Sequence, residues 1–494
     1  MVKPVYIFLF LVCVLLALGG IGLIFPSEGF EVAGFTVKFP NYISFLNSKK
    51  EEKKDISKIL ALAEEADKPA TAIKTNPAKD TFTVNKERKF TGREISDTAL
   101  KRSTGIQYGD SLENALYSFF EALATMAKGD APLRILHYGD SQIEGDRITD
   151  YLRLKLQSNF GGGGPGLLSV MPVAQGYSFW QSWSNNWNRY TIFAGKDKQI
   201  SHANYGVAAS FCRYCNPKDS ISTQSAWLRI KPIFKKGNPV FSYSRLRIFY
   251  GIESGSASLE VSENNKITAL DSIYGQGCFN DKIINLQFPG TPCEIQWKGN
   301  ACPDVYGVSL ESSEGIIVDN FGLRGSSGTF FNMMNFDQLR KFLNTLNTRL
   351  IILQFGGNAL PAIRDQKGCE NFGNYLKAQI VSLKKLKPGV SILVIGPSDM
   401  SLKVEGEFTT YPLLEPLRDA IRQAAFKTNS GFFDMYECMG GHNSMLSWVE
   451  QGIAATDYIH FSPAGARKIA VLLYSAIMSD YNKFIRNKTK IQKG

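Results

Sequence analysis

The sequence predicts an α/β protein whose parallel sheet is covered by helices on both faces, interrupted by an inserted β domain and preceded by an N-terminal transmembrane helix. Three observations lead to this fold class. Apolar strand-like runs alternate with helix-like periodicity in residues 91–166 and again in 316–485. Residues 167–315 instead contain short alternating segments that are typical of antiparallel strands. Residues Val5–Phe25 carry no charge.

The uncharged run at the start of the chain has the length of a membrane span. As a helix, Val5–Phe25 would be roughly 31 Å long, which matches a bilayer core of about 30 Å. Lys3 precedes the run, Pro26 ends it, and no clear small-x-small cleavage site is present. We expect residues 1–25 to be an inner-membrane anchor with the following domains in the periplasm; a cleaved signal peptide is the alternative.

The composition is that of a globular protein long enough for two folded units, with 494 residues of which 44% are hydrophobic. A net charge of +11 suggests nucleic-acid binding at first sight. The lysines, however, lie in the mixed run Lys49–Lys54 and towards the basic tail, 486–494, and no basic helix with interleaved aromatics occurs. We therefore expect no nucleic-acid partner and interpret the charge as solubility and attraction to an anionic envelope surface.

Residues 26–90 are predicted to form a stalk between the anchor and the first folded domain. Its candidate elements are a hairpin at Gly29–Phe39, an amphipathic helix marked by Ile56, Ile59, Leu60 and Leu62, and a Pro/Ala/Thr/Lys-rich linker at Lys68–Asp80. The chain contains no internal repeat.

The α/β domain, first part 91–166, contains a predicted helix at Ser111–Met126 and an apolar strand at Leu133–Leu136. The strand breaks into Gly139-Asp-Ser141, and helical spacing resumes from Arg147. Such a strand–turn–helix lifts a serine Oγ to the carboxyl edge of a sheet and aims helix N–H groups at the same point. Gly-Asp-Ser by itself is equally typical of an ordinary turn, so its meaning depends on the rest of the chain.

A glycine-rich run, Gly161–Gly166, leads out of this part of the chain. It lacks the Gly-Lys-Ser/Thr ending of a phosphate-binding loop and follows a helix, so we expect a flexible exit into the insert. The insert, 167–315, is predicted to be a β-sandwich or jelly roll that binds carbohydrate. Its opening segment places Trp180, Trp183 and Trp187 among amide side chains, which suits stacking on sugars, while burial in a core is the alternative for each ring.

Five of the eight cysteines lie in the insert, and two of them form the motif Cys212-x-x-Cys215. The motif has no second pair and no histidine close by in the sequence, so we expect a disulfide or two buried thiols rather than zinc. No metal and no cofactor is expected.

Strands and helices alternate again in the second part of the α/β domain, 316–485. The predicted strands are 315–319, 349–355, 390–395 and 431–435, and the predicted helices are 336–346, 375–386, 413–425 and 463–484. Sites in such sheets form beyond the carboxyl ends of the strands. Four stretches carry residues of chemical interest: Gly139-Asp-Ser141, Asn320–Gly325, Gly356-Gly-Asn358 and Asp457-Tyr-Ile-His460.

These four stretches, in this order, resemble the sequence blocks of the SGNH hydrolases, the GDSL-type esterases and acyl-hydrolases. The resemblance covers about 95–165 and 316–480, and it implies a three-layer, flavodoxin-like fold. It differs at Ala359, where the family has an aspartate in a supporting position. The resemblance implies a nucleophile, Ser141, an acid–base pair, Asp457 and His460, and an oxyanion hole formed by the N–H groups of Ser141 and Gly325 and the amide of Asn358.

The chemistry of these residue types agrees with those roles. A serine hydroxyl becomes a good nucleophile when an imidazole takes its proton, and a carboxylate fixes the tautomer of that imidazole. Preorganised N–H donors stabilise the oxyanion, and losing one typically costs about 10²–10³ in rate. His442 is close enough in sequence to the Asp457–His460 loop to be a further candidate for substrate contact.

Three functions are compatible with these features. The leading hypothesis is an envelope serine esterase that removes O-acetyl groups from a polysaccharide or from peptidoglycan, because a β domain inserted between the first two blocks resembles peptidoglycan O-acetylesterases. The second is a transferase that takes acetyl from a membrane acyltransferase partner and passes it to a glycan. The third is a non-catalytic glycan-binding envelope protein, against which the intact blocks argue.

Overall fold

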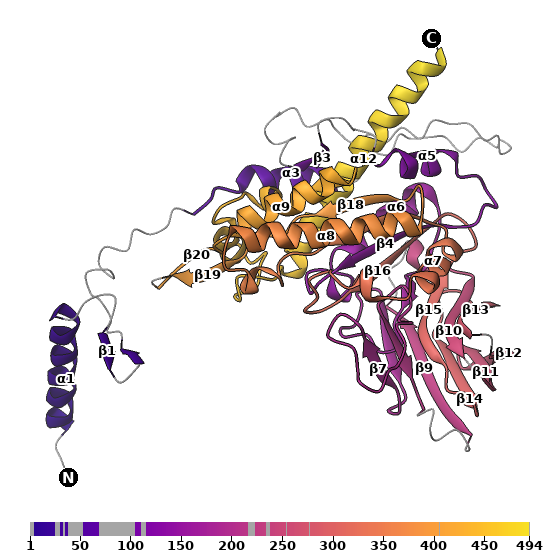
Figure 1. The fold of residues 1–494 in the computed structure, drawn as a ribbon, viewed down its shortest axis with the longest axis horizontal. Coiled ribbons are helices and arrows are strands. Elements are labelled where there is room, and N and C mark those ends of the chain that lie inside the picture. The colour runs from indigo at the N-terminus through magenta and orange to yellow at the C-terminus, as the bar shows by residue number, and fades with distance from the viewer. Residues whose placement is uncertain are drawn as a thin grey trace. The chain divides into compact units, whose positions relative to one another are not determined.

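The structure is a computed structural model, and it describes residues 4–24, 30–32, 35–37, 53–68, 104–109, 115–215, 223–233, 238–252, 254–275, 277–404 and 406–493. The chain divides into two compact units. One comprises Met1–Lys53 and Leu402–Thr409, and the other comprises Lys54–Ser401 and Thr410–Gly494. The larger unit contains both the α/β domain and the inserted β domain (Figure 1).

The central sheet of the α/β domain has six strands, of which five are parallel, as predicted. Its spatial order is β16 (Ile316–Gly322), β4 (Leu133–Gly139), β17 (Thr348–Gln354), β18 (Ser391–Ile395), β21 (Gly431–Phe433) and β3 (Ile106–Gln107). The short strand β3 pairs antiparallel with β21 and was not predicted. Gly139 of β4 is in register with Gly322 of β16 and with Gln354 of β17. The chain therefore leaves these three neighbouring strands at one edge of the sheet.

Helices cover both faces of this sheet because side chains alternate along each strand. Leu133 and Ile135 of β4 belong to one hydrophobic cluster, and Leu136 and Tyr138 belong to the other. The first cluster is completed mainly by α3 (Ser57–Asp67), α5 (Tyr117–Thr125), α6 (Thr149–Phe160), α10 (Met435–Met439), α11 (Ser444–Glu450) and α12 (Pro463–Lys493). The second is completed by α7 (Phe336–Thr345), α8 (Gln366–Leu386) and α9 (Leu414–Lys427), which Figure 1 shows together. The three-layer architecture is confirmed.

The predicted helices differ from the observed ones mainly at their ends. Helix α8 begins nine residues before the predicted start, because Asp365 accepts a hydrogen bond from the Gly368 N–H (2.7 Å) and caps the first turn. Helix α12 continues to Lys493, through most of the predicted basic tail. The start of the predicted helix at 111 lies outside the described residues.

The amphipathic helix predicted within the stalk, α3, packs on the α/β domain. Ile56 and Ile59 are buried in its hydrophobic cluster. Asp67, at the helix end, accepts hydrogen bonds from the Tyr151 hydroxyl (3.0 Å) and from the Arg467 guanidinium (3.0 Å). Residues 54–68 therefore belong to the folded body, which differs from the predicted stalk. Most of the predicted linker, from residue 69, lies outside the described residues.

The N-terminal unit contains the predicted helix, α1 (Pro4–Ile24), and the predicted hairpin, β1 (Phe30–Val32) with β2 (Phe35–Val37). Within the described parts of the chain, no helix has the combined length and apolar character needed to cross a bilayer. The helix predicted in this region is present over Pro4–Ile24, and its prediction as a membrane span is not supported. The same unit contains most of a second hairpin, β19 (Ser401–Val404) with β20 (Glu407–Thr410).

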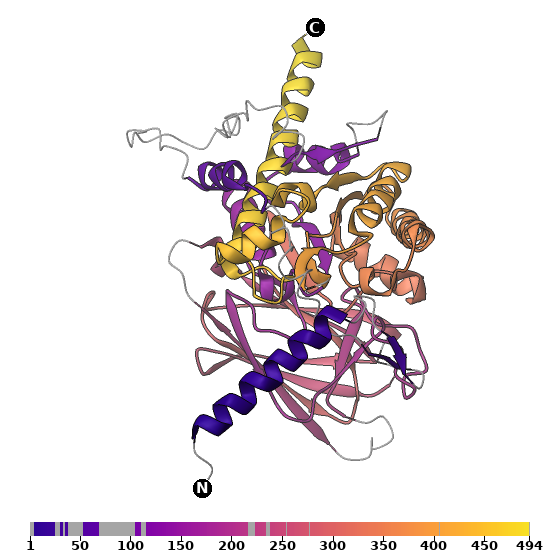
Figure 2. The same ribbon diagram turned by 90° about the vertical axis from the view of Figure 1, so that its left-hand side faces the viewer.

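The insert is a β-sandwich, as predicted. One sheet contains β13 (Gly277–Asn285), β10 (Arg245–Ile252), β15 (Asp304–Glu311), β8 (Ser210–Arg213) and β7 (Asn188–Thr191), with β5 (Gly166–Leu168) also paired to β15. The other contains β12 (Lys266–Tyr274), β11 (Ser256–Glu263), β14 (Cys293–Gly299), β9 (Gln224–Pro232) and β6 (Phe179–Trp183). One hydrophobic cluster draws residues from both sheets. In Figure 2 these strands lie together on one side of the helices of the α/β domain.

The glycine-rich run between α6 and β5 is closely packed, which corrects the expectation of a flexible exit. Gly162 and Gly164 have φ values of +105° and +90°, a region that glycine adopts at no steric cost. A Cβ at Gly162 would overlap the carbonyl of Ile316, and one at Gly164 would overlap the carbonyl of Leu310. Glycine is therefore required here, because the segment that leaves the α/β domain packs directly against the segment that returns to it.

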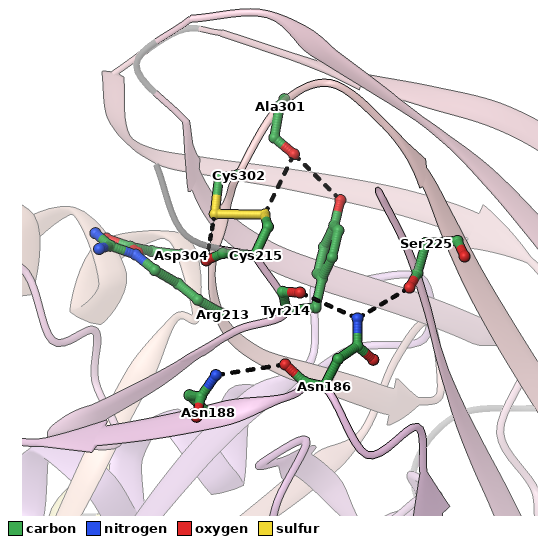
Figure 3. Close-up of a disulfide and its surroundings, with 9 residues drawn as sticks. All are labelled: Asn186, Asn188, Arg213, Tyr214, Cys215, Ser225, Ala301, Cys302 and Asp304. Carbon is green, nitrogen blue, oxygen red and sulfur yellow. Dashed lines mark hydrogen bonds and ion pairs between the residues drawn. A yellow bond between two sulfur atoms is a disulfide. The ribbon is translucent and has the colours of Figure 1, made fainter. Parts of the chain in front are cut away.

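A disulfide joins Cys215 to Cys302 in the insert, with a Cα–Cα distance of 5.6 Å (Figure 3). It links the end of β8 to the segment before β15. Cys212, the other member of the Cys-x-x-Cys motif, is a buried free thiol whose pKa burial raises to about 11. A disulfide is thus present, but it joins Cys215 to a cysteine 87 residues away and not to Cys212.

Candidate active site

The four sequence blocks converge at the edge where β16, β4 and β17 end. Ser141 follows β4 by two residues, and the Leu323 N–H after β16 donates a hydrogen bond to the Gly139 carbonyl (2.8 Å). Asn358 follows β17 by four residues. The register of the parallel strands places these loops side by side, so the local strand–turn patterns are sufficient to assemble them.

Ser141, His460 and Asp457 form a continuous chain of hydrogen bonds. Ser141 Oγ lies 2.8 Å from His460 Nε2, and His460 Nδ1 lies 2.8 Å from Asp457 Oδ2. With Nδ1 protonated and donating to the carboxylate, Nε2 is the acceptor for the serine hydroxyl. Asp457 Oδ1 also accepts hydrogen bonds from the N–H groups of Ile459 (2.9 Å) and His460 (3.0 Å). The loop thus fixes the carboxylate and the imidazole as one unit.

The hydrogen bonds also keep Asp457 ionised. Burial raises its pKa, but the His460 N–H and ring and the Ile459 N–H outweigh burial and hold the pKa below its ordinary value. A carboxylate that stays charged is what the imidazole needs when it takes a proton.

A cavity of about 150 Å³ opens in front of Ser141 and His460. Asn358 lines it, and its Nδ2 donates a long hydrogen bond to the Ser326 carbonyl (3.3 Å). Gly325, next to Ser326, has a φ of +79°. It lies in a turn that is closed by a hydrogen bond from the Ser326 N–H to the Leu323 carbonyl (2.9 Å). Gly325 is not among the residues that line the cavity. Most of the remaining lining is apolar and includes Phe355, Pro361, Pro397, Met400, Met435 and Ile459.

Asp140, beside the serine, is a buried carboxyl group in the same cavity. Burial raises its pKa to about 6, while the hydrogen bond from the Gln142 N–H (2.9 Å) and the nearby His460 act in the opposite direction. The carboxyl group therefore sits where its charge responds to the protonation of the imidazole.

Gln142 is a residue of the site that sequence reasoning missed. Its buried side chain donates from Nε2 to the Ile459 carbonyl (2.6 Å) and to Ser398 Oγ (3.1 Å), and its Oε1 accepts from the Phe461 N–H (3.4 Å). These contacts hold the backbone on both sides of His460. No local sequence pattern indicates that Gln142 positions the His460 loop, because Gln142 and Ile459 are 317 residues apart.

The candidates for substrate contact, His442 and the three tryptophans, do not line this cavity. His442 is exposed, lies 3.8 Å from the Glu415 carboxylate, and is not among the lining residues. Trp187 is buried in the sandwich core, which excludes it from sugar stacking. Trp183 is partly buried against the same core, and Trp180 is 54% exposed on the edge strand β6. Of the three tryptophans, only Trp180 presents most of its ring to solvent.

Comparisons with known proteins identify a solved structure with a similar fold. No protein-family model and no curated protein matches the sequence. Among solved structures, a peptidoglycan O-acetylesterase matches with a TM-score of 0.59 and 21% identity over 74% of this chain and 96% of its own. An acetyl xylan esterase matches 33% of this chain and 81% of its own, with 16% identity and a TM-score of 0.26. At these identities the first likeness shows the fold alone. The chain therefore has the fold of that peptidoglycan O-acetylesterase. In this chain the β-sandwich is inserted after β4 and α6.

Proposed function

We propose that the protein is a serine esterase that removes O-acetyl groups from an envelope glycan. The observation that carries this proposal is the hydrogen-bonded chain from Ser141 through His460 to Asp457, with its serine facing a cavity. A fold shared with a peptidoglycan O-acetylesterase supports the same class of reaction.

In this proposal the Ser141 hydroxyl attacks the acetyl carbonyl while His460 Nε2 takes its proton. The N–H groups of Ser141 and Gly325 and the Asn358 amide stabilise the oxyanion. Collapse of the tetrahedral intermediate breaks the ester C–O bond, and His460 gives the proton to the departing sugar oxygen, which leaves as a hydroxyl. Water, deprotonated by the same imidazole, then attacks the acetyl-serine and releases acetate.

The size of the cavity favours a short acyl group. Its volume of about 150 Å³ and apolar lining suit an acetyl methyl, whereas a long acyl chain would have to displace Phe355, Pro397 or Met400. We therefore expect turnover of 4-nitrophenyl acetate to exceed that of 4-nitrophenyl octanoate by about tenfold or more.

We also propose that the protein works in an exported compartment. A disulfide between Cys215 and Cys302 supports this, because such bonds persist in oxidising environments. Export suits an enzyme whose substrate is an envelope glycan.

Acetate release tests the function directly. We expect the purified protein to release acetate from O-acetylated peptidoglycan or O-acetylated xylan, and not from the same polymers after mild alkaline removal of their ester groups. A parallel reaction supplies an unacetylated glycan as acceptor. Acetyl appearing on that acceptor in place of free acetate would favour a transferase, and intact polymer in both reactions would contradict the proposal.

Gln142 offers a test of positioning. We expect Gln142→Ala to lower kcat on 4-nitrophenyl acetate by about 10- to 100-fold with little change in KM, because a displaced imidazole impairs proton transfer more than binding. Gln157→Ala is the matched control: Gln157 is also buried and donates to two backbone carbonyls, those of Gly164 (2.9 Å) and Ile316 (3.3 Å). Equal losses of kcat in both variants would show a general effect on stability instead.

A further inference from the structure

A second cavity, of about 90 Å³, lies between the α/β domain and the insert. Its walls include Gly145, Gly322 and Leu323 from the α/β domain and Phe179, Arg189 and Ser210 from the insert. Gly145 follows Ser141 by four residues, and Leu323 precedes Gly325 by two. The cavity is therefore formed partly by the two loops that also carry the proposed nucleophile and one proposed oxyanion donor.

Two carboxylates line this cavity, and each has its own arginine. Glu144, 4% exposed, is bound in a two-pronged contact by Arg324, with the shortest distance 2.6 Å from Nη2 to Oε2. Asp146 is bound by both terminal nitrogens of Arg153 at 2.9 and 3.1 Å. These pairs neutralise the acidic side of the cavity.

Arg189 also lines the cavity, and Glu144, the carboxylate that acts on it electrostatically, is already paired with Arg324. Arg189 lies on β7, where its backbone pairs with Cys212. Its Nε is buried without a hydrogen-bond partner among the described residues. Burial lowers the pKa of Arg189. A buried N–H group without a partner is destabilising, and an anion that accepts its hydrogen bond removes that cost.

We propose that this cavity binds the carboxylate of an acidic sugar through Arg189, and that it thereby selects an acidic O-acetylated glycan as the substrate of the site at Ser141. This inference rests on the proposed function. The cavity is too small for a sugar ring and large enough for a pendant carboxylate. A singly charged carboxylate matches the one arginine in the described part of the chain whose buried Nε has no hydrogen-bond partner.

Binding can be measured without catalysis in the Ser141→Ala protein. The probes are N-acetylmuramic acid against N-acetylglucosamine, which lacks the lactyl carboxylate, and digalacturonate against its methyl ester. Calorimetry should show tighter binding of at least one acid than of its neutral partner by about tenfold or more. A response to the muramic acid pair points to a peptidoglycan glycan strand whose lactyl carboxylates are free of peptide, and a response to the galacturonate pair points to a uronic acid polysaccharide. Equal affinity within both pairs would overturn the inference.

Variants locate the preference. Adding Arg189→Gln should remove most of the tenfold discrimination, and Arg189→Lys should keep part of it because the charge remains without the two-pronged geometry. Arg229→Gln is the control, since Arg229 is an exposed arginine of the insert paired with Glu294 on β14. Unchanged discrimination in Arg189→Gln, with an unchanged melting temperature, would also overturn the inference. Binding is measured without turnover. If the wild-type protein were inactive but still preferred acids, the esterase proposal would be contradicted and the proposed carboxylate site would remain.

Discussion

Ser141→Ala should reduce turnover of 4-nitrophenyl acetate by at least about 10⁴-fold while leaving the fold intact. The serine Oγ is the group within hydrogen-bond distance of His460 Nε2, so its removal leaves the imidazole without a nucleophile to deprotonate. Alanine at 141 leaves the turn after β4 with its backbone contacts. The measurement is kcat at saturating substrate, together with the melting temperature and the circular dichroism spectrum.

Covalent labelling separates the nucleophile from other serines near the cavity. A fluorophosphonate probe should add one label to the wild-type protein and none to Ser141→Ala. Ser398→Ala is the matched control, because Ser398 lines the same cavity but its Oγ accepts from Gln142 and does not contact His460. Wild-type turnover by Ser141→Ala, or persistent labelling of it, would remove Ser141 from its role and the esterase proposal with it.

The site could be predicted from the sequence as far as it is made of local patterns. Gly139-Asp-Ser141, Asn320–Gly325 and Gly356-Gly-Asn358 each lie at the carboxyl end of an apolar strand, and a parallel sheet brings these ends to one edge. Asp457 and His460 are three residues apart in one loop. Neither step needs knowledge of distant contacts.

The features that could not be predicted depend on contacts between distant segments. The Gln142 side chain donates a hydrogen bond to Ile459, 317 residues away. Arg189 becomes a candidate binding residue only because it lines a cavity between two domains. The glycine run at 161–166 has the composition of a flexible linker, yet the carbonyls of Ile316 and Leu310 crowd it. Cys215 pairs with Cys302 and not with its neighbour in the motif. In each of these cases the composition of the segment was known, but its conformation and contacts depend on packing against segments distant in the sequence.

The three tryptophans show the same limit, and they lead to the largest expected effect on stability. Trp187 is 3% exposed, donates from Nε1 to the Trp227 carbonyl (3.1 Å), and packs edge-on against Tyr214 and Trp297 with ring centroids 5.0 and 5.3 Å apart. We expect Trp187→Ala to lower the free energy of unfolding of the insert by about 3–5 kcal/mol, because it leaves a cavity in the core of the sandwich.

Trp180→Ala is the control for this substitution, since the same residue type is removed from an exposed position of β6 in the same domain. Trp180 is 54% exposed on the edge strand β6, so the loss should be about 0.5 kcal/mol or less. Urea unfolding of the full chain, followed by circular dichroism and by near-ultraviolet signals of the insert, measures both variants. Equal unfolding midpoints would contradict the assignment of Trp187 to the core. With the expected difference, any loss of activity on acetylated polymer in Trp187→Ala reflects unfolding of the insert, and Trp180 alone remains as the ring whose removal tests stacking on a sugar.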